Sequence, residues 1–372
     1  MSDLTPDHTN ENDFLPENYD FDLPECLIAQ YPAPKREDAR MLVLDRASGS
    51  RFHKNVCDLA DIVRGDEVVV VNDTRVIPAR LVGRRQTGGK VELLVIPDRL
   101  SVGSLSGGDN SRFRCLSKAS GKLRPGEELL FGDRDVVRID EVCDNGVVVV
   151  DFRRVGGAMS LMSRYGQVPL PPYIQRDRNV PSSPADHERY QTIFASQSGA
   201  VAAPTAGLHL THGILDSLKN RGVPVARVTL HVGPGTFLPI RAANLRDHTV
   251  LPEFASISSE TASYLNDARH RGRRILAVGT TTVRTLESFI DENGQIGAGD
   301  REVALTIRPG YRFRAIAAML TNFHLPRSSL LVLVSVFAGR SSVLDAYSDA
   351  VARGYRFYSY GDAMLIGDYN TL

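Results

Sequence analysis

Apolar and polar residues follow two different patterns along this chain. Toward both ends, short apolar runs typical of buried strands alternate with segments that have the spacing of helices. The expected strands are residues 40–45, 67–72, 225–231 and 274–278, and the expected helices are residues 258–269, 282–290, 328–337 and 345–353. The length of segment 328–337 also allows a buried strand. Strands that alternate with helices are characteristic of an α/β domain.

The middle of the chain is different, because short β-rich stretches are separated there by Gly, Asp and Ser turns. These stretches are residues 90–96, 112–117, 135–142 and 146–152, and the Gly/Ser loop 101–111 lies among them. Such strands favour an antiparallel barrel or sandwich. We therefore predict a mixed α/β domain, residues 14–80 and 165–372, with an inserted antiparallel β-barrel domain, residues 81–164. The polar residues 1–13 are expected to form a disordered tail.

Composition narrows the cellular setting. The 372 residues carry 44 basic and 44 acidic side chains, so an RNA partner would have to be held by local patches rather than by net charge. The four cysteines are widely spaced without a CxxC pair, and we expect neither a metal site nor a disulfide framework. The N-terminus lacks signal-peptide features, and the most apolar run, residues 330–339, is too short to span a bilayer. We expect a cytoplasmic protein.

Two segments combine small residues with a histidine, which favours a small-molecule site. They are GAVAAPTAGLHLT, residues 199–211, and TLHVGPGTF, residues 229–237, in which His209 and His231 each follow a leucine. Small side chains let a ligand approach the backbone, and imidazole changes charge near neutral pH. Either segment alone fits a buried strand with a hydrogen-bonded core histidine equally well.

Further candidates lie where predicted strands end, which is where α/β sheets usually bind ligands. The segment VVNDTR offers Asn72, Asp73 and Arg75, although Asn-Asp-Thr also makes a good turn. In GTTTVRTLES a threonine can cap the next helix and leave its N–H groups free for a carboxylate. Arg284 and Glu287 in the same segment also have the spacing of an intrahelical ion pair.

Three more segments each allow two interpretations. LTNFHLPRSS places Asn322 and His324 just before a helix, where the histidine serves either a ligand or the core. YRFYSYGDAM gathers four aromatic residues near Arg356 and Asp362, either to contact a positive ligand or to form a C-terminal strand. YGQVPLPPYIQR is either a stiff display of aromatic side chains or a rigid connector between domains.

Two basic patches are candidates for contact with RNA phosphates. Their members are Arg84, Arg85, Lys90, Arg271, Arg273 and Arg274. The second patch follows a predicted helix, where a solvated face is the ordinary explanation. The sequence contains no RNP motif, KH loop or zinc knuckle that would indicate a standard RNA-binding module.

In this order, the segments closely resemble the S-adenosylmethionine:tRNA ribosyltransferase-isomerase family of queuosine biosynthesis. The resemblance runs from YDFDLP to SYGDAML and includes VNDTRVIPARL, TGGKVELL, GAVAAPTAGLHLT, TLHVGPGTF, AVGTTTVRTLES, PGYRF and TNFHLPRSSLL. The chain departs from the family at two places. The usual His-x-Met-His-x-Glu run spans His248 to Glu253 here, with Leu251 at the second histidine, and residues 303–308 lack the usual Thr-Asp and Tyr.

The resemblance implies an α/β domain with an inserted barrel and a reaction on tRNA. The ribosyl part of S-adenosylmethionine would be transferred to 7-aminomethyl-7-deazaguanine at the wobble position and isomerised, giving epoxyqueuosine and releasing adenine and methionine. S-adenosylmethionine is then a consumed substrate, and no metal or other cofactor is expected. The implied partners are this tRNA and S-adenosylmethionine. We expect the protein to be a monomer without membrane contact.

General acid–base groups with pKa near neutrality suit this chemistry. We expect His209, His231 and His324 to be catalytic. Carboxylates could face the sulfonium, and arginines could bind its carboxylate or RNA phosphate. The candidate substrate-binding residues are Asn72, Asp73, Arg75, Thr205, Gly207, Gly233, Gly235, Glu253, Thr280, Thr281, Arg284, Asn322, Tyr360 and Asp362.

Two other classes of function fit parts of the sequence. A nucleotide-using α/β enzyme such as a dehydrogenase is one, but Gly233-Pro234-Gly235 lacks the third glycine of the dinucleotide-binding fingerprint. A non-catalytic RNA-binding protein is the other, and it would bind tRNA while leaving S-adenosylmethionine intact.

Overall fold

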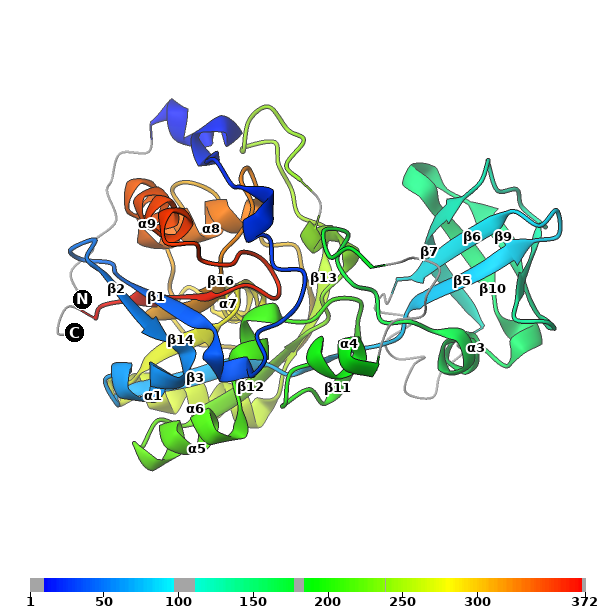
Figure 1. Cartoon of the computed structure of the whole chain (residues 1–372). Helices are drawn as coiled ribbons and strands as arrows, with labels where there is room; N and C mark the ends of the chain where they lie inside the picture. The colour runs from blue at the N-terminus through cyan, green and yellow to red at the C-terminus, as the bar shows by residue number, and fades with distance from the viewer. Residues whose placement is uncertain (1–9, 97–110, 177–183, 238, 370–372) are drawn as a thin grey trace.

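The computed structural model, which describes residues 10–96, 111–176, 184–237 and 239–369, confirms the predicted fold class. Figure 1 shows a large α/β domain with a separate β-barrel beside it. Residues 1–9 of the predicted tail and most of the Gly/Ser loop lie outside the described residues. Residues 11–13 do not continue a tail, because they belong to the 3-10 helix η1 (Glu11–Phe14), whose Phe14 is buried. The predicted boundaries between the domains stay predictions.

A nine-stranded mixed sheet forms the centre of the α/β domain, in the order β15-β13-β12-β3-β14-β16-β17-β1-β2. Its strands are β1 (Arg40–Asp45), β2 (Arg51–Asn55), β3 (Glu67–Asn72), β12 (Val225–Leu230), β13 (Glu253–Ile257), β14 (Arg274–Val278), β15 (Gly299–Val303), β16 (Ala318–Asn322) and β17 (Ala363–Gly367). The neighbours β12, β3, β14 and β16 are parallel, so their carboxyl ends meet at one edge of the sheet.

Helices cover both faces of this sheet. They are α1 (Leu59–Ile62), α5 (His212–Asn220), α6 (Ser259–His270), α7 (Thr280–Phe289), α8 (Ser329–Ala338) and α9 (Arg340–Ala352). Val68 and Val70 of β3 share a buried cluster with residues of α6 to α9, whereas Val69 and Val71 pack with residues of α1 and α5. The apolar run in β3 is therefore buried on both faces, as expected for a parallel strand.

Segment 328–337 is helical, as predicted, and forms α8. The helix expected at 345–353 begins earlier, at Arg340, because Gly339 separates α8 from α9. Among the described residues, no single helix is long and apolar enough to cross a membrane. The two helices reach that length only as a pair bent by 115°.

Six antiparallel strands form the closed barrel, in the order β10-β7-β6-β5-β8-β9. They are β5 (Arg80–Arg85), β6 (Lys90–Val95), β7 (Arg112–Ala119), β8 (Glu128–Phe131), β9 (Asp135–Val142) and β10 (Val147–Asp151), followed by α3 (Ala158–Tyr165). Alternate side chains such as Leu81, Leu93 and Phe131 fill the interior. At Gly83 an added Cβ would lie 2.7 Å from the Phe131 ring, so a side chain does not fit between β5 and β8 without a shift.

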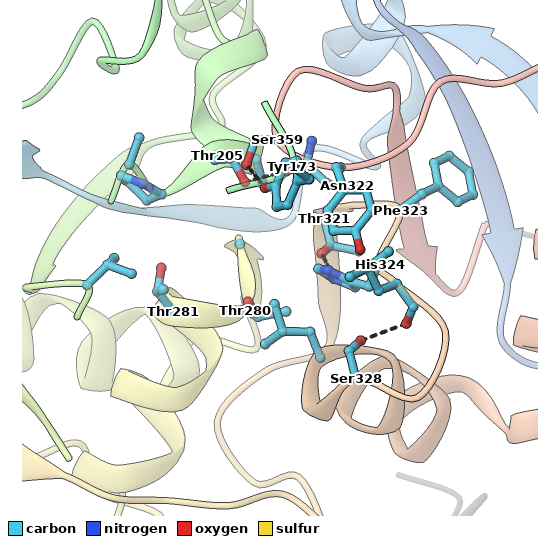
Figure 2. A pocket seen from close by; sticks show the side chains of 18 of the residues that line it. Tyr173, Thr205, Thr280, Thr281, Thr321, Asn322, Phe323, His324, Ser328 and Ser359 are labelled. Carbon is cyan, nitrogen blue, oxygen red and sulfur yellow. Dashed lines mark hydrogen bonds between the residues drawn. The ribbon is translucent and has the colours of Figure 1, made fainter. Parts of the chain in front are cut away.

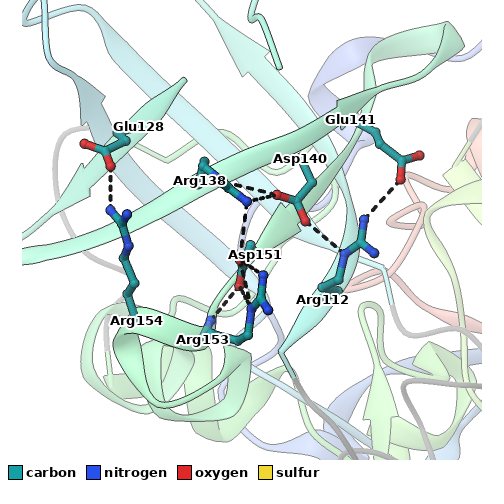
Figure 3. Close-up of polar contacts among 8 residues, drawn as sticks. All are labelled: Arg112, Glu128, Arg138, Asp140, Glu141, Asp151, Arg153 and Arg154. Carbon is teal, nitrogen blue, oxygen red and sulfur yellow. Dashed lines mark hydrogen bonds and ion pairs between the residues drawn. The ribbon is translucent and has the colours of Figure 1, made fainter. Parts of the chain in front are cut away.

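Arginines on the outside of the barrel are paired with carboxylates. Figure 3 shows Asp140 between Arg112 and Arg138, and Asp151 bound by Arg153, which lowers the pKa of Asp151 to about 2. These pairs leave this face with little net positive charge. The barrel interior is apolar, and the paired side chains in Figure 3 balance one another in charge. Both features are consistent with a barrel that is stable without a ligand.

Glu287 of α7 holds the segment that leads into β16. Its buried carboxylate accepts hydrogen bonds from the backbone N–H groups of Arg314, Ala315 and Ile316, and from the Tyr311 hydroxyl. Arg284 instead pairs with Glu253 of β13. The intrahelical Arg284–Glu287 pair that the spacing allowed is therefore not formed.

We expect Glu287→Ala to lower the free energy of unfolding by about 3 kcal/mol or more, because several buried N–H groups would lose their acceptor. Chemical denaturation measures this change. Glu292→Ala, at an exposed position just beyond the same helix, is the control and should change stability by less than about 0.5 kcal/mol. Equal effects of the two substitutions would contradict the role given to Glu287.

Candidate functional site

A cavity of about 270 Å³ lies at the carboxyl ends of the parallel strands. Its walls come from the 3-10 helix η8 (Thr205–His209), the start of α7, the end of β16 and the C-terminal loop before β17. Figure 2 shows Thr205, Thr280, Thr281, Asn322 and His324 around this space. This position at the carboxyl edge of a parallel sheet is where ligands are expected in α/β domains.

Two buried asparagines at strand ends hold the walls together. Asn72, at the end of β3, donates to the Leu230 carbonyl at 2.9 Å and to the Thr281 hydroxyl at 3.2 Å, and its Oδ1 accepts from the Leu230 N–H. Asn322, at the end of β16, accepts from the Thr205 hydroxyl at 2.9 Å. Because a buried amide must be hydrogen-bonded, these contacts fix where η8 and α7 begin relative to the sheet.

The first turn of α7 faces the cavity without a capping side chain. The N-cap residue is Gly279, which has a positive φ of 89°. Because glycine has no side chain, it cannot cap the first N–H groups of the helix. The threonines expected to cap the helix lie inside it instead, and Thr282 donates to the Val278 carbonyl. The first N–H groups and the positive end of the helix dipole are thus directed to the side of the cavity formed by Thr280 and Thr281.

Of the three predicted catalytic histidines, His324 lines this cavity. Its Nε2 lies 2.9 Å from the Thr321 hydroxyl, and its backbone N–H donates to the Tyr347 hydroxyl. Burial lowers the pKa of His324 to about 3, because the charged ring would lose its hydration. The imidazole is therefore neutral at pH 7 and has one nitrogen that can accept a proton.

His209 and His231 lie behind the cavity wall. His209 accepts a hydrogen bond from the Asn322 amide at 3.2 Å and borders a second cavity of about 20 Å³. His231 contacts the Thr74 hydroxyl at 2.7 Å and stacks on Phe254, and a Cβ at Gly199 would come within 2.8 Å of its ring. Burial lowers the pKa of each ring to about 4.

The charged candidates for substrate binding are turned away from the large cavity. Glu253 and Arg284 form a buried ion pair beside a separate cavity of about 30 Å³. Asp73 accepts from the hydroxyls of Thr229 and Ser196, and Arg75 donates to a backbone carbonyl. Asp362 accepts from Arg40 and from the backbone N–H groups of Arg40 and Arg356.

Four other predicted binding residues also lie outside the lining of the large cavity. Gly207 packs so closely on Phe194 that a Cβ would lie 2.8 Å from its ring. Gly233 donates to Glu253, and Gly235 borders the cavity of the Glu253–Arg284 pair. Tyr360 borders the second cavity together with His209.

The two predicted RNA patches lie away from the cavity. Arg273 and Arg274 stand at the beginning of β14, whose far end reaches the cavity, and Arg274 is held by Asp66 and Glu67. Arg85 on the barrel pairs with Glu127. The remaining members, Arg84, Lys90 and Arg271, are exposed.

Sequence reasoning did not select Tyr173, Tyr358 and Ser359, all of which line the cavity. The rings of Tyr173 and Tyr358 lie 4.1 Å apart, and the hydroxyls of Tyr173 and Ser359 are 2.5 Å apart. Tyr358 has a positive φ of 71°, which is unusual for an aromatic residue and common at functional sites. The Pro-rich segment before Tyr173 was a signal for displayed aromatics that could have identified this side chain.

Comparison with known proteins places these observations in one family. The sequence model of the family described as "Queuosine biosynthesis protein" matches residues 16–366. The chain belongs to this family. A relative from Pelobacter propionicus, named S-adenosylmethionine:tRNA ribosyltransferase-isomerase, is 44% identical, with 95% of this chain and 99% of the relative covered. A relative of the same name from Anaeromyxobacter sp. is 49% identical, with 94% and 98% covered.

A solved structure of this family has the same architecture. It is the S-adenosylmethionine tRNA ribosyltransferase from Thermotoga maritima, 31% identical, with a TM-score of 0.51, and the match covers 94% of this chain and 99% of that chain.

The departure from the family pattern at Leu251 lies beside the Glu253–Arg284 cavity, where Leu251 is about half exposed. The remaining histidine of that run, His248, contacts the Ser329 hydroxyl at 2.7 Å.

The lowered histidine pKa values predict a loss of stability in acid. Below about pH 6.5 the unfolded chain takes up protons that the folded histidines accept only near pH 3 to 4, so the free energy of unfolding falls as pH decreases through this window. The slope contributed by each ring reaches at most about 1.4 kcal/mol per pH unit.

Denaturant titrations at pH 7.5, 6 and 5 test this expectation on the wild type and on His231→Asn. The variant should lose less stability between pH 7.5 and 5 than the wild type. His270→Asn, on the exposed end of α6, is the matched control and should follow the wild-type slope. Parallel curves for His231→Asn and the wild type would show that this ring is not held neutral by the fold.

Proposed function

We propose that this protein is an S-adenosylmethionine:tRNA ribosyltransferase-isomerase. It transfers and isomerises the ribosyl moiety of S-adenosylmethionine onto 7-aminomethyl-7-deazaguanine at the tRNA wobble position, giving epoxyqueuosine and releasing adenine and methionine. The observation that carries the proposal is the family match over residues 16–366, joined to curated relatives of that name that are covered almost end to end. We expect the reaction to take place in the cytoplasm, on a monomer.

The large cavity suits a sulfonium nucleoside. Among the described residues its lining contains no carboxylate, and its one arginine, Arg327, is paired with Asp20. The lining offers hydroxyl oxygens and the paired rings of Tyr173 and Tyr358. Aromatic faces attract organic cations and stack on nucleobases. The proposal therefore assigns the positive sulfur to this aromatic wall, in place of the carboxylates considered from the sequence.

The methionine carboxylate of the substrate has a separate place in this cavity. The uncapped first turn of α7, at Thr280 and Thr281, presents N–H groups and the positive end of a ten-residue helix. An anion at a helix N-terminus accepts these hydrogen bonds and is stabilised by the dipole. Arg284, considered for this role from the sequence, is occupied by Glu253.

The chemistry needs a base near the 5′ carbon of the substrate, whose protons are acidified by the adjacent sulfonium. His324 is the predicted catalytic histidine whose ring lines the cavity, and we propose it as this base. Because burial lowers its pKa to about 3 in the empty site, the role requires that substrate binding brings this pKa back toward neutrality. It removes a 5′ proton. The amine of 7-aminomethyl-7-deazaguanine then bonds to the ribosyl carbon that adenine leaves, and closure of the cyclopentane epoxide breaks the carbon–sulfur bond and releases methionine. His209 contacts the wall from behind through Asn322, and His231 contacts Thr74 outside the lining, so we assign both as positioning residues.

The direct test mixes the protein with S-adenosylmethionine and a tRNA that carries 7-aminomethyl-7-deazaguanine. Release of free adenine and a matching increase in tRNA mass are expected. The same tRNA with guanine at the wobble position is the control and should give neither product. Binding of both reactants without adenine release would refute the proposed function.

We expect His324→Ala to reduce kcat by about 10²-fold or more, because a general base contributes about that factor or more. His209→Ala should lower kcat less, because its ring reaches the cavity only through Asn322. His270→Ala is the surface control and should keep wild-type turnover. Full activity of His324→Ala, with thermal melting unchanged, would exclude this residue as the base.

A further inference from the structure

The second cavity, beside His209, is surrounded by positive charge. Arg36, Arg189 and Arg356 line it, and Ser359 borders both this cavity and the large one. Its volume of about 20 Å³ admits a single water molecule or one oxygen atom of a larger group. Arg36 and Arg356 are half-buried, so the cavity lies close to the surface.

These three guanidinium groups are held in place by backbone carbonyls. Arg36 donates to the carbonyls of Leu208 and Glu188 at 2.9 Å each. Arg189 donates to the carbonyls of Ala33 and Pro34, and Arg356 to those of Tyr31 and Tyr360. Each contact uses part of a group that has five N–H donors, so each arginine is oriented without being neutralised.

No carboxylate within the described ranges forms an ion pair with Arg36, Arg189 or Arg356. The acidic groups nearby include Asp362, which is bound by Arg40, Asp186, which is bound by Arg176, and the exposed Glu188, whose charge acts on Arg36. Arg36 and Arg189 also repel each other, which together with burial lowers the pKa of Arg36.

A buried donor at this site lacks an acceptor. The Nε of Arg189 is inaccessible to solvent and has no hydrogen-bond partner among the described residues. Such unsatisfied buried groups are uncommon, and one on a cation beside a cavity indicates a missing anionic partner. Three oriented guanidinium groups match the geometry by which proteins bind oxyanions.

We propose that this cavity is an oxyanion subsite that holds a backbone phosphate of the RNA substrate. The inference rests on the proposed function, because the RNA nucleotide would enter the large cavity on the other side of Ser359. A phosphate is favoured over the methionine carboxylate for two reasons. The wall formed by Ser359, Asn322 and His209 separates this cavity from a ligand in the large one, and the carboxylate already has the start of α7.

This subsite differs from the patches considered from the sequence. Arg273 and Arg274 stand at the opposite end of β14, and Arg274 is neutralised by Asp66 and Glu67. Arg36 and Arg356 belong instead to the segments around Pro32 and Tyr360 that border the second cavity, and Ser359 next to Tyr360 also lines the large cavity. A phosphate bound here would fix the register of the RNA next to the reacting nucleotide.

The test compares Arg189→Gln and Arg36→Gln with the wild type in tRNA affinity and steady-state kinetics. For each substitution, Kd and KM for tRNA should rise about tenfold, while kcat and KM for S-adenosylmethionine stay within twofold. The slope of log Kd against log salt concentration should decrease by about one, because one phosphate contact is lost. Arg227→Gln, at an exposed position on β12, is the matched control with unchanged values.

Arg189→Lys keeps the positive charge and should retain most of the salt dependence of tRNA affinity. A purely structural role of Arg189 would not predict this difference between the Lys and Gln variants. Thermal melting of each variant establishes that it is folded. Unchanged tRNA affinity in folded Gln variants would overturn the subsite, and so would a rise confined to KM for S-adenosylmethionine. Because tRNA affinity is measured without turnover, the two proposals can fail separately. A smaller salt slope in the Gln variants, together with a wild type that binds tRNA but releases no adenine, would support the subsite while refuting the proposed function.

Discussion

The site depends on two almost fully buried amide side chains that must be hydrogen-bonded within the protein. Asn72 and Asn322 end two strands of the parallel sheet, and both are almost fully buried. A lone buried amide is costly, so each asparagine fixes the chain that supplies its partners. Asn72 thereby connects β3 with β12 and α7, and Asn322 connects β16 with the two ends of η8, Thr205 and His209. The open space between these connected elements is the large cavity.

The same exclusion of water determines the protonation states in the site. Without hydration or a directly paired carboxylate, the rings of His209, His231 and His324 stay neutral. A neutral imidazole has a nitrogen that can accept a proton, and the cation that lines the large cavity, Arg327, is paired with Asp20. The fold thus confines its formal charges to pairs such as Glu253–Arg284 and to the arginine-lined cavity next to the site.

Local sequence patterns were sufficient for the fold class and for several strands. β3 and β14 have the predicted bounds because β-branched and aliphatic runs end there at polar residues. β16 was missed, since its sequence AMLTN is short and lacks flanking turn signals. Asn322, Thr280 and Thr281 line the large cavity. The two threonines were selected because they follow the predicted strand 274–278, whereas Asn322 was selected for its place before a predicted helix.

The charged candidates lie outside the lining of the large cavity, each with a partner that is distant in sequence. Nothing near Glu253 indicates that Arg284 neutralises it, and nothing near Asp362 indicates Arg40. Contacts that span 31 and 322 residues are set by sheet order, which local patterns do not determine. The arginine-lined cavity was missed for the same reason, because Arg36, Arg189 and Arg356 come from three separate segments.

A crystal structure with bound S-adenosylmethionine, in the absence of tRNA, tests the central claim most directly. The account predicts the sulfonium nucleoside in the large cavity, with its carboxylate at the first turn of α7, its cationic part against Tyr173 and Tyr358, and its 5′ carbon within reach of His324. A ligand seated beside the Glu253–Arg284 pair, or on the barrel, would contradict it.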